Sequence, residues 1–173
     1  ILNQIFDEMQ MESIQKLPES TFYDLMRLGY LSENYRYSYR RIWVDADQNS
    51  KVRGLIDMYS YNDQKIIDFA LKSKYAKVGL PTTTVIFDDQ EAWPHEWYID
   101  ALATNPDDWG KGIGGSLLDA ASKIAKQHGY HKLSLNVDKE NPRAQRLYEY
   151  KGFKTTNEMT IGDRVYDHMI KEV

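Results

Sequence analysis

Cysteine is absent from the 173 residues of this chain. Without thiols the chain can form no disulfide bond, no zinc–thiolate site and no cysteine nucleophile. Apolar runs of membrane-spanning length are missing as well, and so is the apolar core of a secretion signal. The four histidines lack the spacing of a metal site, and we therefore expect no metal. These absences predict a cytoplasmic protein that does not bind a membrane.

Positive charge is in short supply, since 22 Lys and Arg stand against 26 Asp and Glu, for a net charge of −4. An acidic balance disfavours nucleic acid as a partner, because phosphate backbones attract lysine and arginine. It mildly favours a cationic substrate such as an amine. The length suits one domain with its own core, and no repeat, low-complexity tract or linker divides residues 1–173.

Glycine is sparse, with ten in the chain, yet four of these fall within six residues. They are Gly110, Gly112, Gly114 and Gly115. Apolar residues at helical spacing follow between Ile113 and Ala125, and Gly129 marks the expected end of this helix. A glycine-rich turn that enters a helix presents unpaired backbone N–H groups at the positive end of the helix dipole, which suits a phosphate. The alternative is a tight loop that only packs a helix onto a sheet.

One possible phosphate ligand is a dinucleotide. Gly110, Gly112 and Gly115 satisfy the fingerprint G-x-G-x-x-G, and Asp138 lies where a ribose-binding acid is expected. However, residues 105–109 separate the preceding strand from the first glycine, although the fingerprint needs the strand to end there. Only 58 residues (173 − 115) follow Gly115, too few for the second half of a doubly wound fold. A nicotinamide-dependent oxidoreductase is therefore the weaker alternative.

A different pattern extends over residues 98–153. Residues 104–118 read TNPDDWGKGIGGSLL and resemble the acyl-CoA-binding motif R/Q-x-x-G-x-G/A of the GNAT superfamily of N-acetyltransferases, with Gly112, Ile113 and Gly114 as the G-x-G core. Residues 133–138 (LSLNVD) are similar to the next strand of the family. Residues 141–153 (NPRAQRLYEYKGF) are similar to its segment N-x-x-A-x-x-L-Y-x-x-x-G-F. Agreement in register at three separate places makes the resemblance specific.

The resemblance implies acetyl-CoA as the cosubstrate. In the family the pantetheine arm pairs like an added strand with the backbone of the strand before the glycine loop. The implied binding residues are Leu102, Ala103, Thr104, Gly110, Lys111, Gly112, Ile113, Gly114, Gly115 and Asn141. The chain departs from the family at Trp109, where Arg or Gln often helps to hold the pyrophosphate. This departure leaves more of the task to backbone amides and to Lys111.

Two residues are candidates for the chemistry of acyl transfer. Asp100 is an acid inside an apolar strand, where acids rarely lie without a partner or a role, and family members often place a general base on this strand. The alternative for Asp100 is a surface or salt-bridged acid, and Glu96 is the reserve base. Tyr148 matches the family tyrosine that is thought to protonate the leaving thiolate, or else it packs its helix on the sheet. Asn141 is expected to cap that helix, to contact the cofactor, or both.

The expected elements resemble the GNAT α/β fold, a mixed and mostly antiparallel central sheet flanked by helices. Helices are expected at residues 1–9, 19–28, 63–77, 113–128 and 141–151. Strands are expected at residues 35–44, 52–59, 96–104, 132–137, 153–161 and 164–171, with an irregular segment at 79–94. The first strand of the family is not recognisable, and we expect it upstream of Ile1.

These patterns predict an N-acetyltransferase that moves an acetyl group from acetyl-CoA to a primary amine by direct transfer in a ternary complex. The amine can belong to a small molecule or to a peptide, and a homodimer is compatible with the sequence. Two alternatives are kept. One is the nicotinamide-dependent oxidoreductase, and the other is a non-catalytic acyl-CoA-binding module on the same fold.

Overall fold

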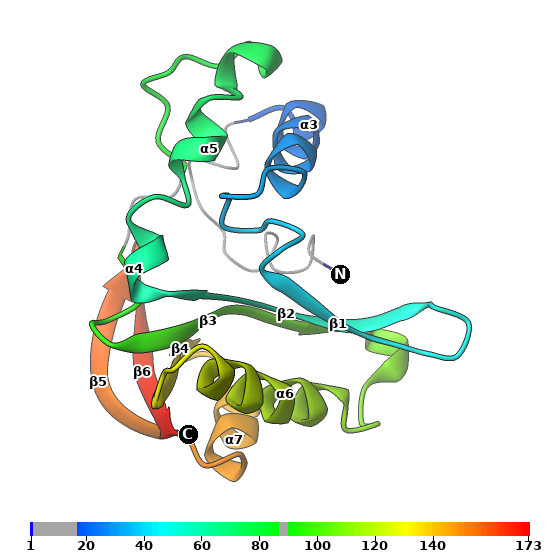
Figure 1. The fold of residues 1–173 in the computed structure, drawn as a ribbon, viewed down its shortest axis with the longest axis vertical. Coiled ribbons are helices and arrows are strands. Elements are labelled where there is room, and N and C mark those ends of the chain that lie inside the picture. Colours follow the sequence, from blue (N-terminus) through cyan, green and yellow to red (C-terminus); the bar gives the residue numbers. More distant parts are fainter. Residues whose placement is uncertain (2–16, 87–89) are drawn as a thin grey trace.

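The computed structural model of the chain describes residues 1, 17–86 and 90–173. Its centre is a six-stranded sheet with helices on both faces (Figure 1). The helix expected at residues 1–9 lies outside the described residues, apart from Ile1. None of the helices that the structure describes has the length and apolar character needed to cross a membrane.

The order of strands and helices follows the expectation closely from residue 96 onward. The strands are β1 (Ile42–Ala46), β2 (Val52–Ser60), β3 (Glu96–Thr104), β4 (Lys132–Asp138), β5 (Lys154–Ile161) and β6 (Arg164–Glu172). The α-helices are α3 (Glu19–Tyr30), α4 (Tyr61–Gln64), α5 (Phe69–Lys72), α6 (Ile113–Gln127) and α7 (Pro142–Tyr150), and the 3₁₀ turns are η1 (Tyr75–Val78) and η2 (Pro106–Asp108). The bounds of α3, α6, α7 and β2 to β6 agree with the sequence to within two residues.

The strands lie in the order β1-β2-β3-β4-β6-β5. The pair β3–β4 is parallel, whereas β1–β2, β2–β3, β4–β6 and β5–β6 are antiparallel. This arrangement confirms the expected mixed, mostly antiparallel sheet. It contradicts the doubly wound parallel sheet that a nicotinamide-dependent oxidoreductase of the Rossmann type needs.

The two parallel strands are paired over only part of their length. Residues Glu96 to Ile99 of β3 pair with Lys132 to Leu135 of β4, and the pairing ends there. Beyond that point β3 continues to Thr104 beside β2, while β4 continues to Asp138 beside β6. The edge of β3 that faces β4 therefore has no strand partner after Ile99 among the described residues. The 3₁₀ turn η2 follows this unpaired stretch and leads into the glycine-rich turn.

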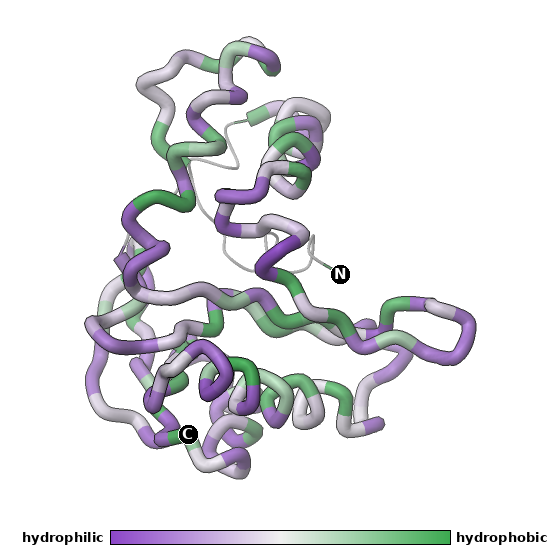
Figure 2. Tube along the Cα trace, viewed as in Figure 1, coloured by the Kyte–Doolittle hydropathy of each residue, from purple (hydrophilic) through white to green (hydrophobic). Residues whose placement is uncertain are grey.

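The main core lies between the sheet and α6, which crosses one face of it with α7 alongside, while α3, α4 and α5 lie on the other face (Figure 1). Figure 2 shows hydrophobic and hydrophilic residues alternating along α6, as an amphipathic helix requires. The buried side chains of this helix are Ile113, Leu117, Leu118, Ala121 and Ala125. Gly54 of β2 lets α6 approach closely, because a Cβ there would lie 2.8 Å from Ile113.

Two expectations for the first half of the chain are wrong. Residues 35–41 form turns, and the strand begins only at Ile42. The side chains at 35–38 are all buried, so the alternation of tyrosines with polar residues does not mark an exposed and a buried face. The helix expected at residues 63–77 is broken into α4, α5 and η1. A capping box at Ser60 starts α4, and the chain turns again where Asp68 forms an ion pair with Arg36.

Candidate active site

The glycine-rich turn leads into α6 without a side-chain cap. Gly110 and Gly112 have φ of +78° and +79°, a conformation that L side chains rarely adopt, and a Cβ at either position would meet no atom within 4 Å. Gly112 is the N-cap of α6, and no described side chain accepts a hydrogen bond from the first turn. The N–H groups of Ile113, Gly114 and Gly115 therefore stay available at the positive end of the helix dipole. Such an end can hold a phosphate.

The last two glycines of the motif have a packing role. A Cβ on Gly114 would lie 3.3 Å from Leu147, and a Cβ on Gly115 would lie 2.9 Å from the side chain of Lys151. Both contacts come from α7 or the residue that follows it. Gly114 therefore leaves room for Leu147, whereas the contact at Gly115 is with the flexible end of Lys151, which could move aside. The tight-packing alternative considered for the motif thus applies to Gly114.

Lys111 does not extend freely from the turn. Its ammonium group lies 2.6 Å from the carboxylate of Asp108 and donates a hydrogen bond to the backbone carbonyl of Asp107. The hydrogen bond from Lys111 lowers the pKa of Asp108. A lysine that is paired with a carboxylate in this way attracts a phosphate less strongly.

A second cation reaches the turn from α7. The guanidinium group of Arg143 lies over the ring of Trp109, 4.2 Å from its centroid. Trp109 is 52% exposed, and its ring N–H donates to the carbonyl of Thr104. Arg143 forms no ion pair with any described carboxylate. At the position where the family often has Arg or Gln, the chain thus places an aromatic ring with an arginine stacked on it.

Asn141 is the N-cap of α7, and Tyr148 lies in its last turn. The side-chain oxygen of Asn141 accepts a hydrogen bond from the N–H of Ala144, so Asn141 caps the helix. Tyr148 is half-buried against the core beneath α6, and its ring lies 6.0 Å from that of Phe153 in an edge-to-face arrangement. The roles of these two residues toward acetyl-CoA stay predictions.

Asp100 lies at a bulge where β3 parts from β4. Asp57 of β2 pairs with Ala101 and Met58 pairs with Ile99, so Asp100 is the extra residue of β3. Its Oδ1 accepts hydrogen bonds from the guanidinium of Arg36 at 2.9 Å and from the hydroxyl of Tyr59 at 2.8 Å. Asp100 therefore forms a salt bridge, as one of its two interpretations predicted, but a buried one.

Arg36 is the centre of a buried ionic cluster. It is 1% exposed and contacts three carboxylates that come from different segments: Asp100 on β3, Asp68 before α5, and Glu91 in the irregular segment before β3. Burial raises the pKa of Glu91, although Arg36 acts in the opposite direction. The cluster carries more negative than positive groups, which favours a cationic ligand nearby.

A chain of hydrogen bonds crosses the point where β3 and β4 separate. Asn136 is the first residue of β4 beyond the pairing, and its amide nitrogen donates to the hydroxyl of Tyr98, 3.1 Å away. The Tyr98 hydroxyl in turn donates to Glu91 at 2.7 Å. The Asn136 amide oxygen lies 2.7 Å from His168, whose other ring nitrogen lies 3.2 Å from Glu96. These contacts link β3, β4 and β6 near the point where β3 and β4 separate.

Glu96, the reserve candidate for a base, is a poor one in this setting. Burial acts to raise its pKa, but the hydrogen bond with His168 prevails, together with a bond from the N–H of Trp93, and the pKa is lowered. A carboxylate with a lowered pKa is a weak proton acceptor. Among the described residues, no cluster of three His, Asp or Glu is placed to hold a metal ion.

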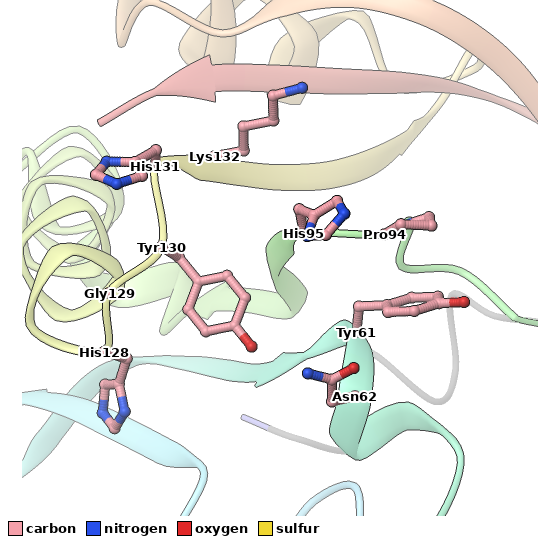
Figure 3. Close-up of a pocket in the computed structure, with 9 residues that line it drawn as sticks. All are labelled: Tyr61, Asn62, Pro94, His95, His128, Gly129, Tyr130, His131 and Lys132. Carbon is pink, nitrogen blue, oxygen red and sulfur yellow. The ribbon is translucent and has the colours of Figure 1, made fainter.

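A cavity of about 660 Å³ lies elsewhere on the sheet. Figure 3 shows its lining, with Tyr61 and His95 on one side and His131 and Lys132 on the other. His131 and Lys132 stand at the start of β4, His95 lies just before β3, and Tyr61 begins α4. The glycine-rich turn follows the end of β3, so the cavity opens at the opposite end of the parallel pair and is separate from the candidate site.

Sequence reasoning missed several residues of the site. Arg36 falls within the strand expected at residues 35–44, and nothing in the local pattern indicates that its side chain is buried. Asp57 carried the same signal as Asp100, an acid between apolar residues of a strand, and the rule that selected Asp100 would have selected it too. Asn136 and His168 had no pattern of their own, because only the pairing of β4 with β6 brings them together.

Comparisons with known proteins agree with one another. The family model "Acetyltransferase (GNAT) family" matches residues 2–153. A solved structure described as "The crystal structure of acetyltransferase" has a TM-score of 0.87 and 38% identity, covering 99% of this chain and 90% of that one. The N-acetyltransferase from Staphylococcus aureus Mu50 has a TM-score of 0.81 and 28% identity, covering 98% and 91%.

A curated relative is similar over a shorter stretch. The mycothiol acetyltransferase of Beutenbergia cavernae is 38% identical over 55 residues, which are 32% of this chain. The match spans only 18% of that relative's length.

Removal of the Arg36 charge tests the role of the buried cluster. We expect Arg36→Met to lower the free energy of unfolding by about 3–5 kcal/mol at pH 7, because it leaves buried carboxylates without a counter-charge. Loss of the guanidinium raises the folded-state pKa of Glu91 further. The loss of unfolding free energy caused by Arg36→Met should therefore shrink as the pH falls toward about 4.3, the pKa of a glutamate in the unfolded chain.

Denaturant unfolding at pH 7 and pH 5 measures this difference. Arg40→Met is the matched control, since the Arg40 side chain is 57% exposed and pairs with Glu33 at the surface. We expect the control to leave stability almost unchanged at both pH values. Equal losses in the two variants would contradict a special role for Arg36.

Proposed function

The chain belongs to the GNAT family of acetyltransferases and is an acetyl-CoA-dependent acyltransferase, and from this premise we propose that it acetylates a primary amine by direct transfer within a ternary complex. One observation carries the proposal. The unpaired edge of β3 runs from Asp100 to Thr104 and ends at the uncapped first turn of α6. An acidic cluster lies at the other end of that edge.

The residues along this edge fit the parts of acetyl-CoA. The N–H groups of Ile113, Gly114 and Gly115 would hold phosphate oxygens, with Gly110 and Gly112 allowing the turn. The backbone of Leu102, Ala103 and Thr104 would pair with the pantetheine arm, as an added strand does. When bound, acetyl-CoA supplies the activated acetyl thioester. The protein fixes its position, which is a large part of catalysis in transfer between two bound substrates.

Two side chains act on the reacting groups in this proposal. Asp100 lies where β3 and β4 separate, and its Oδ2 accepts no hydrogen bond from the described residues, so it can orient the amine. Tyr148 donates a proton to the leaving thiolate, because a neutral phenol at pH 7 has a proton to give. A primary amine suits the excess of carboxylates around Arg36 better than a neutral or anionic acceptor does.

The glycine turn gives the first test. We expect acetyl-CoA to bind and to raise the thermal stability of the chain, and NAD to do neither. Gly112→Val should weaken acetyl-CoA binding at least tenfold (about 1.4 kcal/mol), because a β-branched residue cannot hold φ of +79° and the turn loses its shape. Calorimetry with both ligands measures this. Gly129→Val is the matched control, since Gly129 has the same φ at the other end of α6. Binding of NAD alone would overturn the proposal.

The arginine stacked on Trp109 gives the second test. We propose that Arg143 supplies positive charge to the phosphate, because the charge of Lys111 is matched by Asp108. Arg143→Gln should therefore weaken the binding of acetyl-CoA about tenfold, with the loss growing at low salt. The control is Arg146→Gln on the same helix, where the side chain is also exposed. Calorimetry with acetyl-CoA, and with CoA lacking its 3′-phosphate, identifies the phosphate involved. Equal affinities for the two variants would remove Arg143 from the site.

The third test concerns Tyr148. Replacement by Phe keeps the ring and its contact with Phe153 but removes the hydroxyl. We expect Tyr148→Phe to bind acetyl-CoA normally and to lose about 10²-fold or more in kcat, the usual scale of one acid–base group. Steady-state kinetics with a melting curve measure both quantities. Tyr150→Phe, 85% exposed on the same helix, is the control. Full kcat in Tyr148→Phe would reduce Tyr148 to a packing residue.

A further inference from the structure

Asp57 is a buried acidic residue for which the described residues supply no hydrogen bond and no ion pair. It lies in the middle of β2, it is 0% exposed, and neither carboxylate oxygen has a hydrogen-bond partner among the described residues. Burial of a carboxylate without donors is costly, and proteins usually pair or hydrogen-bond such groups. Nothing within the sheet explains why an acid stands here in place of an apolar residue.

The strand register places Asp57 next to Asp100. Asp57 pairs with Ala101, and the bulge inserts Asp100 directly before it. Tyr59 lies two residues along β2 on the same face and donates to Asp100 Oδ1. Asp100 Oδ2 also lacks a partner in the described part of the chain. Both oxygens of Asp57 and Oδ2 of Asp100 are therefore buried carboxylate oxygens, on neighbouring residues of β2 and β3, that accept no hydrogen bond from the described residues.

Charge at this place is unbalanced. The groups that act on the Asp57 carboxylate are Asp100, Arg36 and Arg41. Arg36 already contacts Asp68, Glu91 and Asp100, and Arg41 lies 3.3 Å from Asp63. Burial, followed by the charge of Asp100, raises the pKa of Asp57 well above its ordinary value. A cation with several N–H donors would satisfy the unpaired oxygens and balance the charge.

We propose that Asp57 and Asp100 Oδ2 together bind the ammonium group of an alkylamine acceptor, and that Asp57 removes its proton. This inference rests on the proposed function and names its substrate class. Asp100 is held in place by Arg36 and Tyr59, so it positions the amine. Asp57 has no donor that stabilises its charged form, which makes it the better proton acceptor.

The proton balance of the reaction follows from this assignment. An N–H bond of the ammonium breaks, its electron pair stays on nitrogen, and the proton goes to Asp57. The nitrogen then bonds to the thioester carbonyl carbon, the C–S bond breaks, and sulfur takes a proton from Tyr148. The second proton leaves nitrogen as the amide forms and returns to Tyr148, while Asp57 releases its proton to water. One proton is released for each alkylammonium ion acetylated.

Asp57→Asn separates a functional role from a structural one. With 1,4-diaminobutane and ethylamine as acceptors, we expect kcat/KM to fall about 10²-fold at pH 7, the scale of one general base. The difference in kcat/KM between Asp57→Asn and the unaltered chain should narrow as the pH rises toward the pKa of the amine, because free amine then needs no base. Aniline, which is neutral at pH 7, should lose much less. Acetyl-CoA affinity should stay unchanged.

The stability of Asp57→Asn is a second measurement: the substitution should lower turnover but should not lower the melting temperature. The folded-state pKa of Asp57 is raised, so its charge destabilises the fold at every pH above the unfolded value of about 3.9. Asp57→Asn should therefore melt at the same or a higher temperature than the unaltered chain at pH 8. The gain should disappear near pH 4. A carboxylate with only a structural role would give the reverse, a lower melting temperature at pH 8.

A control variant and two possible results distinguish a failure of this inference from a failure of the proposed function. Asp45→Asn, which removes an acid paired with Arg53 on the neighbouring strand β1, should leave turnover unchanged. Failure of the unaltered chain to bind acetyl-CoA in calorimetry would overturn both the proposed function and this inference. Normal acetyl-CoA binding with full turnover in Asp57→Asn would overturn only the role of Asp57, and so would a loss that is the same at all pH values.

Discussion

The buried guanidinium of Arg36 is the interaction that joins segments lying far apart in the sequence. Its ion pairs with Asp68, Glu91 and Asp100 link residues 35–41 to the segment before α5, to the residues just before β3, and to β3 itself. Apart from β3, these segments have little regular secondary structure, so backbone pairing does little to position them. A planar fork with five donors can hold several carboxylates at fixed angles, which a lysine could not do. One side chain therefore ties three irregular segments to a strand of the sheet.

The separation of β3 from β4 is the main irregularity of the sheet. Pairing ends after four residues, and the chain of hydrogen bonds from Glu91 through Tyr98, Asn136 and His168 to Glu96 makes polar contacts near the point of separation. Main-chain groups along the β3 edge and in the first turn of α6 have no strand partner and no side-chain cap among the described residues. The bulge at Asp100, beside Asp57 of β2, lies where this edge begins. Under the proposed function, the edge would face acetyl-CoA and the bulge would face the amine.

The second half of the chain was predictable because its signals are local. A few neighbouring residues are enough to predict each element there, as the helical spacing, the Asn141–Pro142 start of α7 and the glycine motif show. The first half was not, because tertiary contacts decide it. Tyr35 and Arg36 alternate as in a strand, yet Arg36 is buried by partners that lie 32 to 64 residues away in the sequence. A periodic pattern over a few residues cannot predict that a charged side chain is buried when its partners are so far away in the sequence.

The glycine-rich turn constrains its four glycines for different reasons, and this has an evolutionary consequence. A larger residue at Gly114 would have to push Leu147 aside, whether or not a phosphate is ever bound, whereas one at Gly115 would meet only the flexible end of Lys151. Gly110 and Gly112 meet no neighbouring atoms, but their positive φ favours glycine even without a ligand. A descendant that lost its enzymatic activity would therefore still be selected to keep glycine at three of the four positions. The preservation of the motif in a relative is thus, by itself, weak evidence for cosubstrate binding.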